Sequence, residues 1–79
     1  MDVVSAWDIE QIRLAAMQYR RESRIAQRRD PLTREDELEA ALLAGKCQMA
    51  VECLGLLGYS CAWSLYGHRL TIWRRDDAV

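Results

Sequence analysis

The stretch YSCAWSLYGHRLTIWRR, residues 59–75, decides the fold. Its apolar side chains recur at every second position, whereas those before it recur with a helical period. Gly67 and His68 fit a two-residue type II′ turn with the glycine first. The stretch therefore predicts a two-stranded antiparallel β-hairpin, and a turn at these two residues places Leu65 opposite Leu70 on its apolar face.

The same register predicts which residues share the outer face of the hairpin. These are the pairs Tyr66 with Arg69, Ser64 with Thr71, and Ala62 with Trp73. A lone hairpin is marginal in water, and both of its strands are edges with unpaired backbone groups. We therefore expect two copies of the chain to join their hairpins into a four-stranded sheet, as a homodimer. In the alternative, the helices cover one face and the arginines of the hairpin protect the rest.

A helix of about residues 33–57 precedes the hairpin. Thr33 and Asp36 have the spacing of a capping box, and Gly58 suits the C-terminal cap. The acidic residues of this region suit the positive end of the helix dipole, or they would bind a basic partner. Gly45 is a weak point. A break there would give three helices and a hairpin, which is the order of a winged helix. The third helix would then be the DNA-recognition helix, but it has few polar side chains to contact bases.

An earlier helix covers about residues 6–29. Ser5 and Asp8 form a second capping-box pattern, and Pro31 disfavours helical geometry at Asp30. The chain is therefore expected to be a single α+β domain of all 79 residues. Its fold class is two antiparallel helices followed by a C-terminal two-stranded antiparallel β-hairpin.

Helical spacing predicts which side chains form the core. On the first helix one arc holds Ile9, Ile12, Ala16, Tyr19 and Ala26. On the second helix the core face holds Leu38, Leu42, Met49, Cys53 and Leu56, widened by Leu43, Cys47, Ala50, Leu54 and Leu57. A further strip of Trp7, Leu14 and Ile25 needs cover from the hairpin, the N-terminal arm, a second copy or a partner.

Five arginines form an adjacent arc of the first helix: Arg13, Arg20, Arg21, Arg24 and Arg28. Guanidinium groups in such a row would contact phosphates. A dedicated nucleic-acid module usually has a basic balance, however, and this chain carries a formal net charge of -1. The arc is better interpreted as a solvated face or an arginine-rich protein interface, with nucleic-acid binding as the alternative.

The sequence has few residues suited to catalysis, and we expect no enzymatic activity. His68 is the only histidine and lies in the predicted turn. Cys47 and Cys53 diverge on a helix, there is no CxxC or HxxxH pattern, and Cys53 and Cys61 suit small core positions. Phosphate-binding glycine motifs are also missing. No metal and no cofactor are therefore expected.

The chain begins without the pattern of a secretory signal, and no apolar run is long enough to span a bilayer. The three cysteines are an odd number, which favours reduced thiols. These features predict a cytoplasmic protein with no membrane contact.

The most consistent function is a small non-catalytic protein-interaction module. Phages and mobile elements use such domains as inhibitors that occlude a host enzyme or defence complex, as anti-CRISPR proteins do. The predicted contacts with a protein partner are Tyr66, Arg69 and Trp73 on the hairpin, with Arg20, Arg24 and Arg28 on the first helix. The alternatives are a nucleic-acid-binding regulator and an assembly subunit whose hairpin extends a neighbour's sheet.

Overall fold

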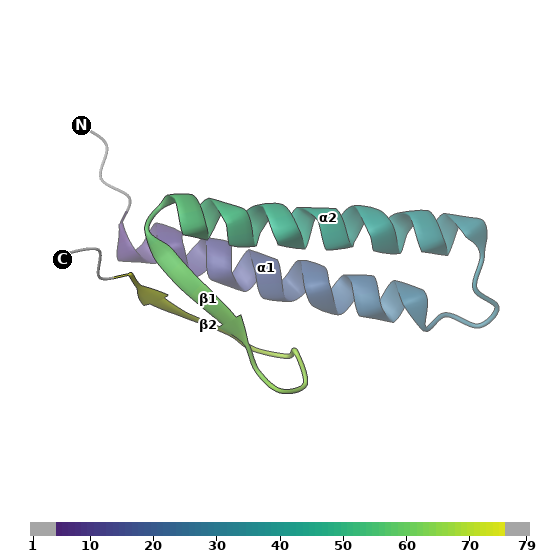
Figure 1. The fold of residues 1–79 in the computed structure, drawn as a ribbon. Coiled ribbons are helices and arrows are strands. Elements are labelled where there is room, and N and C mark those ends of the chain that lie inside the picture. Colours follow the sequence, from purple (N-terminus) through teal and green to yellow (C-terminus); the bar gives the residue numbers. More distant parts are fainter. Residues whose placement is uncertain (1–4, 76–79) are drawn as a thin grey trace.

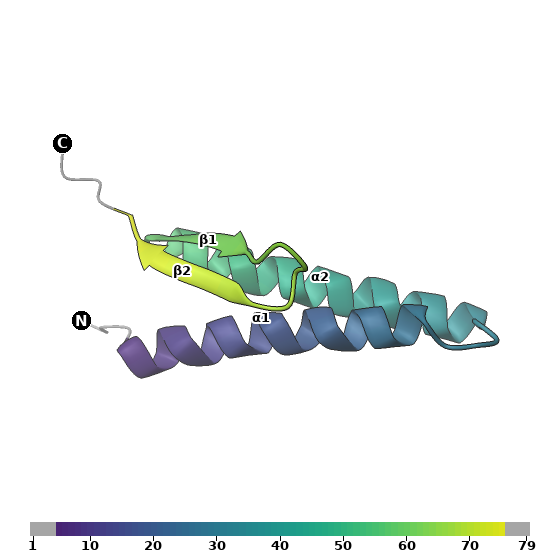
Figure 2. The same ribbon diagram turned by 90° about the horizontal axis from the view of Figure 1, so that it is seen from below.

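The computed structural model describes residues 5–75, and it confirms the predicted α+β fold (Figure 1). The elements are α1 (Ala6–Gln27), α2 (Arg34–Leu56), β1 (Tyr59–Trp63) and β2 (Leu70–Arg74). The helices lie side by side and antiparallel, and the hairpin lies across one side of the pair (Figures 1 and 2). The sequence also predicts a loose tail over residues 76–79, and these residues lie outside the described part of the chain.

Both predicted capping boxes are confirmed. The Ser5 hydroxyl accepts a hydrogen bond from the Asp8 amide at 3.1 Å, and the Asp8 carboxylate accepts one from the Ser5 amide at 3.2 Å. Thr33 and Asp36 make the same reciprocal pair, with both bonds at 3.1 Å. These bonds satisfy amide groups that have no partner within the helix, so they fix where each helix begins.

The connection between the helices is held by Arg29. Its guanidinium donates to Asp36 at 2.7 Å and to Glu39 at 2.8 Å, which joins the end of α1 to the first turns of α2. The Arg29 hydrogen bond is the main reason that the pKa of Asp36 lies below its ordinary value, and the bonds from Thr33 add to it. Two carboxylates of the acidic region are therefore engaged within the chain.

Helix α2 runs through Gly45 without a break, so residues 5–75 contain two helices and not the three of a winged helix. A glycine inside a helix costs about 1 kcal/mol relative to alanine. The packing of α2 against both α1 and β1 outweighs this cost, because tertiary contacts supply most of the stability of a helix in a folded protein.

The core between the helices is made mainly of small side chains. The buried residues on α1 are Ile9, Ala16, Ser23 and Ala26, and those on α2 include Ala40, Cys47 and Leu54. The buried Ser23 hydroxyl donates to the Ala40 carbonyl at 2.8 Å. Small residues let two helix backbones approach closely, and here the approach is close enough for a serine to bond across it.

The predicted core face of α1 is confirmed, whereas that of α2 is confirmed only in part. On α1, Ile9, Ala16 and Ala26 are buried, with Ile12 and Tyr19 half-buried beside them. On α2, Cys47 and Leu54 are buried as predicted. The other predicted side of α2 is exposed instead: Leu38, Leu42, Met49, Cys53 and Leu56. The physical reason is that close packing against the small residues of α1 selects the face with Ala40, Cys47 and Leu54.

The hairpin forms as predicted, but its register differs by two residues. Trp63 pairs with Leu70, not with Ile72. The Ser64 amide donates to the Arg69 carbonyl at 2.8 Å, and the Ser64 hydroxyl accepts from the Arg69 amide at 3.1 Å. These bonds close a longer loop over residues 64–69. A shift of two residues keeps every strand side chain on its predicted face, but it removes Leu65 from the strand.

Candidate interaction surface on the hairpin loop

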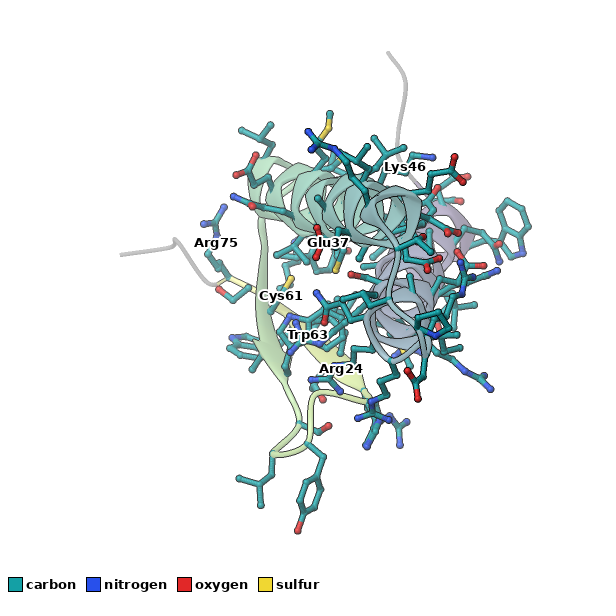
Figure 3. All side chains as sticks on the ribbon, turned by 90° about the vertical axis from the view of Figure 1, so that its right-hand side faces the viewer. Arg24, Glu37, Lys46, Cys61, Trp63 and Arg75 are labelled. Carbon is teal, nitrogen blue, oxygen red and sulfur yellow. The ribbon has the colours of Figure 1, made fainter. Side chains whose placement is uncertain are left out.

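Arginines of α1 hold the hairpin loop by its backbone. Arg20 Nε donates to the Gly67 carbonyl at 3.1 Å, and Arg24 Nη1 donates to the Tyr66 carbonyl at 2.8 Å. The Arg20 guanidinium also lies 4.5 Å from the centroid of the Trp63 ring, a cation–π contact. Figure 3 shows Arg24 and Trp63 between α1 and the hairpin.

A third arginine extends this contact toward the strand. Arg13 Nη1 donates to the Leu70 carbonyl at 2.8 Å, and the same guanidinium forms an ion pair with Glu10 one turn earlier. The Arg13 hydrogen bond is the main reason that the pKa of Glu10 lies below its ordinary value. Three guanidiniums of the predicted arginine arc are thus bound to backbone oxygens of this chain.

The loop fits against these arginines because residue 67 is a glycine. Gly67 is buried and has a φ of 70°, which disfavours any residue with a side chain. A Cβ atom built there would lie 2.6 Å from Nη2 of Arg24 and 2.8 Å from Nη2 of Arg20. Gly67 is therefore needed both for the turn and for the approach of the two guanidiniums.

On its other side the loop exposes large side chains. Leu65 is 91% exposed and Tyr66 is 72% exposed, although the Tyr66 carbonyl is bound by Arg24. The Tyr66 ring lies beside that of His68, with centroids 6.3 Å apart. Helix α1 thus fixes the backbone of the loop, while its apolar and aromatic groups remain in contact with solvent.

An open hollow of about 850 Å³ lies beside the loop, between it and the second half of α1. Its lining includes Arg21, Arg24, Arg28, Ile25 and His68. Guanidinium groups and an imidazole therefore border the exposed tip of the loop on this side.

The six predicted contact residues have different environments. Tyr66, Arg69 and Trp73 are exposed on the hairpin, and Arg28 is exposed near the end of α1. Arg20 and Arg24 are half-buried and bind the loop backbone. The structure therefore brings Arg24 and Arg28 to the hollow beside the loop, and it places Trp73 apart from them on β2.

Sequence reasoning missed Leu65, which it placed on the inner face of the hairpin, and the structural role of Gly67. An arginine bond to a carbonyl oxygen has no sequence signature, because every residue has that oxygen. Gly67 itself was the available signal, because it was correctly predicted to lie in the connection between the strands.

The thiols differ in their surroundings. Burial raises the pKa of Cys47 and that of Cys61, which keeps both groups protonated at neutral pH. Cys53 is exposed on α2, contrary to its predicted core position. Within residues 5–75 no group of three or more histidine, cysteine, aspartate or glutamate side chains has the geometry to hold a metal ion.

The described helices also include none that is both long enough and apolar enough to cross a membrane. A scan against protein-family models, a search of curated proteins and a search of solved structures each found no match. Function is therefore inferred from the chemistry and geometry of the described residues.

Proposed function

We propose that this protein is a non-catalytic protein-interaction module that binds its partner through the hairpin loop. One observation carries the proposal: Arg20 and Arg24 fix the loop backbone, while the side chains of Leu65 and Tyr66 remain exposed. An inhibitor that occludes a host enzyme or defence complex, of the kind encoded by phages and mobile elements, would act in this way.

A loop of this kind is suited to binding a protein partner tightly, for two reasons. Tyrosine is among the residues that contribute most to protein interfaces. A loop that is already held in one conformation loses little entropy when it binds, so more of its contact energy appears as affinity. Arg20 and Arg24, predicted as direct contacts, are assigned here to holding the loop.

The residues around the loop define the chemistry of the partner. Arg21, Arg24 and Arg28 outnumber Glu22 in the hollow beside the loop, and Arg69 is exposed at the end of the loop. The complementary surface is an apolar pocket bordered by carboxylates, because electrostatic complementarity selects partners and orients them. Trp73 would extend the contact along β2.

The test is capture of partners from a host lysate with the tagged chain, with and without nuclease. A protein that stays bound after nuclease is then titrated against two variants. Leu65→Ala with Tyr66→Ala should weaken binding at least tenfold, because it removes the exposed side chains of the loop. Leu32→Ala, an exposed apolar residue in the connection between the helices, is the control and should bind like wild type. Unchanged binding by the loop variant would contradict the proposal.

Nucleic-acid binding is the second candidate, and the hollow lined by Arg21, Arg24 and Arg28 favours it. Its prediction is different: the captured material would be lost on nuclease treatment, and affinity would fall steeply with salt. Arg21→Glu with Arg28→Glu would then abolish binding, while the Leu65 and Tyr66 variant would not. The acidic net charge and the use of Arg13, Arg20 and Arg24 within the chain make this the weaker candidate.

A cytoplasmic location is part of the same proposal. The three cysteines form no disulfide, which fits a reducing compartment. Fractionation of cells that express the tagged chain, with each fraction probed for the tag, tests this location directly.

A further inference from the structure

Helix α2 has a second apolar face that the single chain leaves uncovered. Leu38, Leu42, Met49 and Leu56 are between 61% and 89% exposed. They recur at three- and four-residue steps once Gly45 and Cys53 are included, and they lie about 180° around the helix from the buried Cys47 and Leu54. A helix that is apolar on both sides is normally buried on both sides. We call these six residues the outer face of α2.

Gly45 is the midpoint of the 23-residue helix and lies between Leu42 and Met49 on this outer face. A Cβ atom at Gly45 would meet nothing within 4 Å, so the single chain gives no steric reason for a glycine. The residue nevertheless costs the helix about 1 kcal/mol relative to alanine. A glycine between Leu42 and Met49 leaves a gap in the row of side chains, where the backbone of another helix can approach.

We propose that the outer face of α2 binds the same face of a second copy of the chain, antiparallel, with the two helices crossing at Gly45. A twofold axis at this residue places Leu42 of one copy beside Met49 of the other, and Leu38 beside Cys53. Each contact then occurs twice, as a twofold symmetric interface requires. This self-association is independent of the proposed function, since the loop with Leu65 and Tyr66 remains outside the interface.

Charges beside the outer face of α2 favour a second copy in this direction. Arg34 and Glu52 are both exposed, and helical spacing places them on the same side of α2, about five turns apart and next to Leu38 and Leu56. An antiparallel pair brings Arg34 of each copy near Glu52 of the other, whereas a parallel pair would bring like charges to the same level.

The outer face of α2 is a small interface. A helix of this length extends for about 35 Å at 1.5 Å per residue. One helix face is smaller than the surface of about 800 Å² that each partner contributes to a standard interface. We therefore expect weak association and set the expected dissociation constant on the order of 10 µM.

Sedimentation equilibrium tests the interface. The apparent mass should rise with concentration from the 9.1 kDa of one chain toward twice that value. Leu42→Glu with Met49→Glu should stay monomeric, because it places carboxylates in the apolar contact. Both side chains are exposed in the single chain, so the fold, followed by circular dichroism, should not change. The control Leu65→Glu, in the hairpin loop, should associate like wild type.

Two results would overturn the proposal. One is a wild-type chain that remains monomeric up to about 500 µM, well above the expected dissociation constant. The other is a chain with both Leu42→Glu and Met49→Glu that still dimerises like wild type.

Gly45→Ala tests the crossing point, because its two effects have opposite signs. Alanine should raise the melting temperature of the monomeric Leu42→Glu and Met49→Glu chain, since it favours the helix and meets no neighbour. In the otherwise wild-type chain the same change should weaken association about tenfold by keeping the two backbones apart. A Gly45→Ala chain that dimerises as tightly as wild type excludes a crossing at this residue.

Disulfide trapping tests whether the two α2 helices pair antiparallel or parallel. Under mild oxidation Leu38→Cys should form a dimer through the Cys53 thiol of the second copy, and the additional change Cys53→Ser should abolish it. Wild type should not cross-link through Cys53, because the antiparallel arrangement keeps the two Cys53 thiols apart. Efficient Cys53 to Cys53 cross-linking in wild type would mean a parallel pair and would contradict the proposed geometry.

Discussion

At the scale of single residues, Gly67 has the most demanding environment in the described chain. It combines a positive φ, burial, and two guanidiniums within about 3 Å of where a Cβ would lie. A substitution there changes the conformation of the loop and displaces the groups that hold it. Gly55 is a natural comparison, since it lies in a helix with open space around it.

We expect Gly67→Ala to lower the free energy of unfolding by about 1–2 kcal/mol, from the strained φ and the weakened arginine bonds. Gly55→Ala should raise it by a few tenths to about 1 kcal/mol, because alanine favours the helix. Urea unfolding of the three chains at equal, low concentration measures both changes. Equal stability of wild type and Gly67→Ala would mean that the loop is not held as described.

Asp36 carries a pH dependence. Its pKa is held below the ordinary value, first by Arg29 and then by Thr33, so the ionised form is favoured by folding. This stabilisation is complete above the ordinary pKa and is lost as the pH falls through the lower, folded-state pKa. Asp36→Asn should therefore lower the melting temperature at pH 7. The difference from wild type should shrink below about pH 4.

Thermal unfolding of wild type and Asp36→Asn across this pH range provides the measurement for Asp36. Glu35→Gln is the matched control, since Glu35 lies in the same first turn and forms no ion pair within residues 5–75. If the difference in melting temperature between wild type and Asp36→Asn stays constant down to pH 2, the ionised Asp36 carboxylate does not stabilise the fold as described.

At the scale of elements, the close contact of α1 and α2 depends on residues without bulk. Ala16, Ser23 and Ala40 are buried between the helices, and the Ser23 to Ala40 hydrogen bond requires the short separation. A larger side chain in this seam must push the helices apart, because native cores have little empty space.

Ala16→Leu should therefore cost about 1–3 kcal/mol of stability through overpacking. Ala41→Leu makes the same chemical change on an exposed position of α2 and should cost almost nothing. Denaturant unfolding of both variants tests this expectation. If Ala16→Leu is as stable as Ala41→Leu, the helices are not packed as closely as the Ser23 bond indicates.

The helices and strands could be predicted from the sequence because their ends have local causes. Ser5 and Thr33 form their capping boxes with residues three positions away, and Gly58 ends α2 with a φ of 95°. Local causes could not predict which side of the wide apolar surface of α2 is buried. Both sides of that helix are apolar, and the choice between them depends on small residues of α1 that lie far away in sequence.

The candidate site could be predicted only in part for the same reason. The exposure of Trp73 follows from its outer position on the hairpin. The loop that carries Tyr66 is instead defined by Ser64 and by bonds from Arg20 and Arg24 to carbonyl oxygens, which are contacts between distant parts of the chain. A turn assigned from Gly67 alone therefore had the wrong length.

At the scale of the whole molecule, the arginines of α1 add hydrogen bonds to the apolar packing, centred on the buried Leu70, that joins the hairpin to the helices. A two-stranded hairpin is marginal by itself, and here β1 packs on α2 while β2 packs on α1 (Figure 2). The loop extends beyond the strands, where Arg20 and Arg24 are its described hydrogen-bond contacts with α1.

Arg20→Ala with Arg24→Ala should release the loop while the helices stay folded, at a cost of about 1–2 kcal/mol. Hydrogen exchange should show faster exchange at Gly67 and His68, with little change in α1 and α2. Arg21→Ala with Arg28→Ala is the control and should leave the loop amides protected as in wild type. Unchanged exchange at Gly67 in the first variant would show that the arginines do not hold the loop.

The arginine bonds to carbonyl oxygens also bear on how such a protein can evolve. Every amino acid supplies a carbonyl oxygen. The hydrogen bonds from Arg20 and Arg24 to the loop backbone therefore do not depend on which residues occupy positions 65 and 66. Substitutions at these two positions leave the anchoring intact and alter only what the loop offers to a target. A lineage under pressure to follow a changing host protein would therefore accumulate its replacements at positions 65 and 66 and retain Arg20, Arg24 and Gly67.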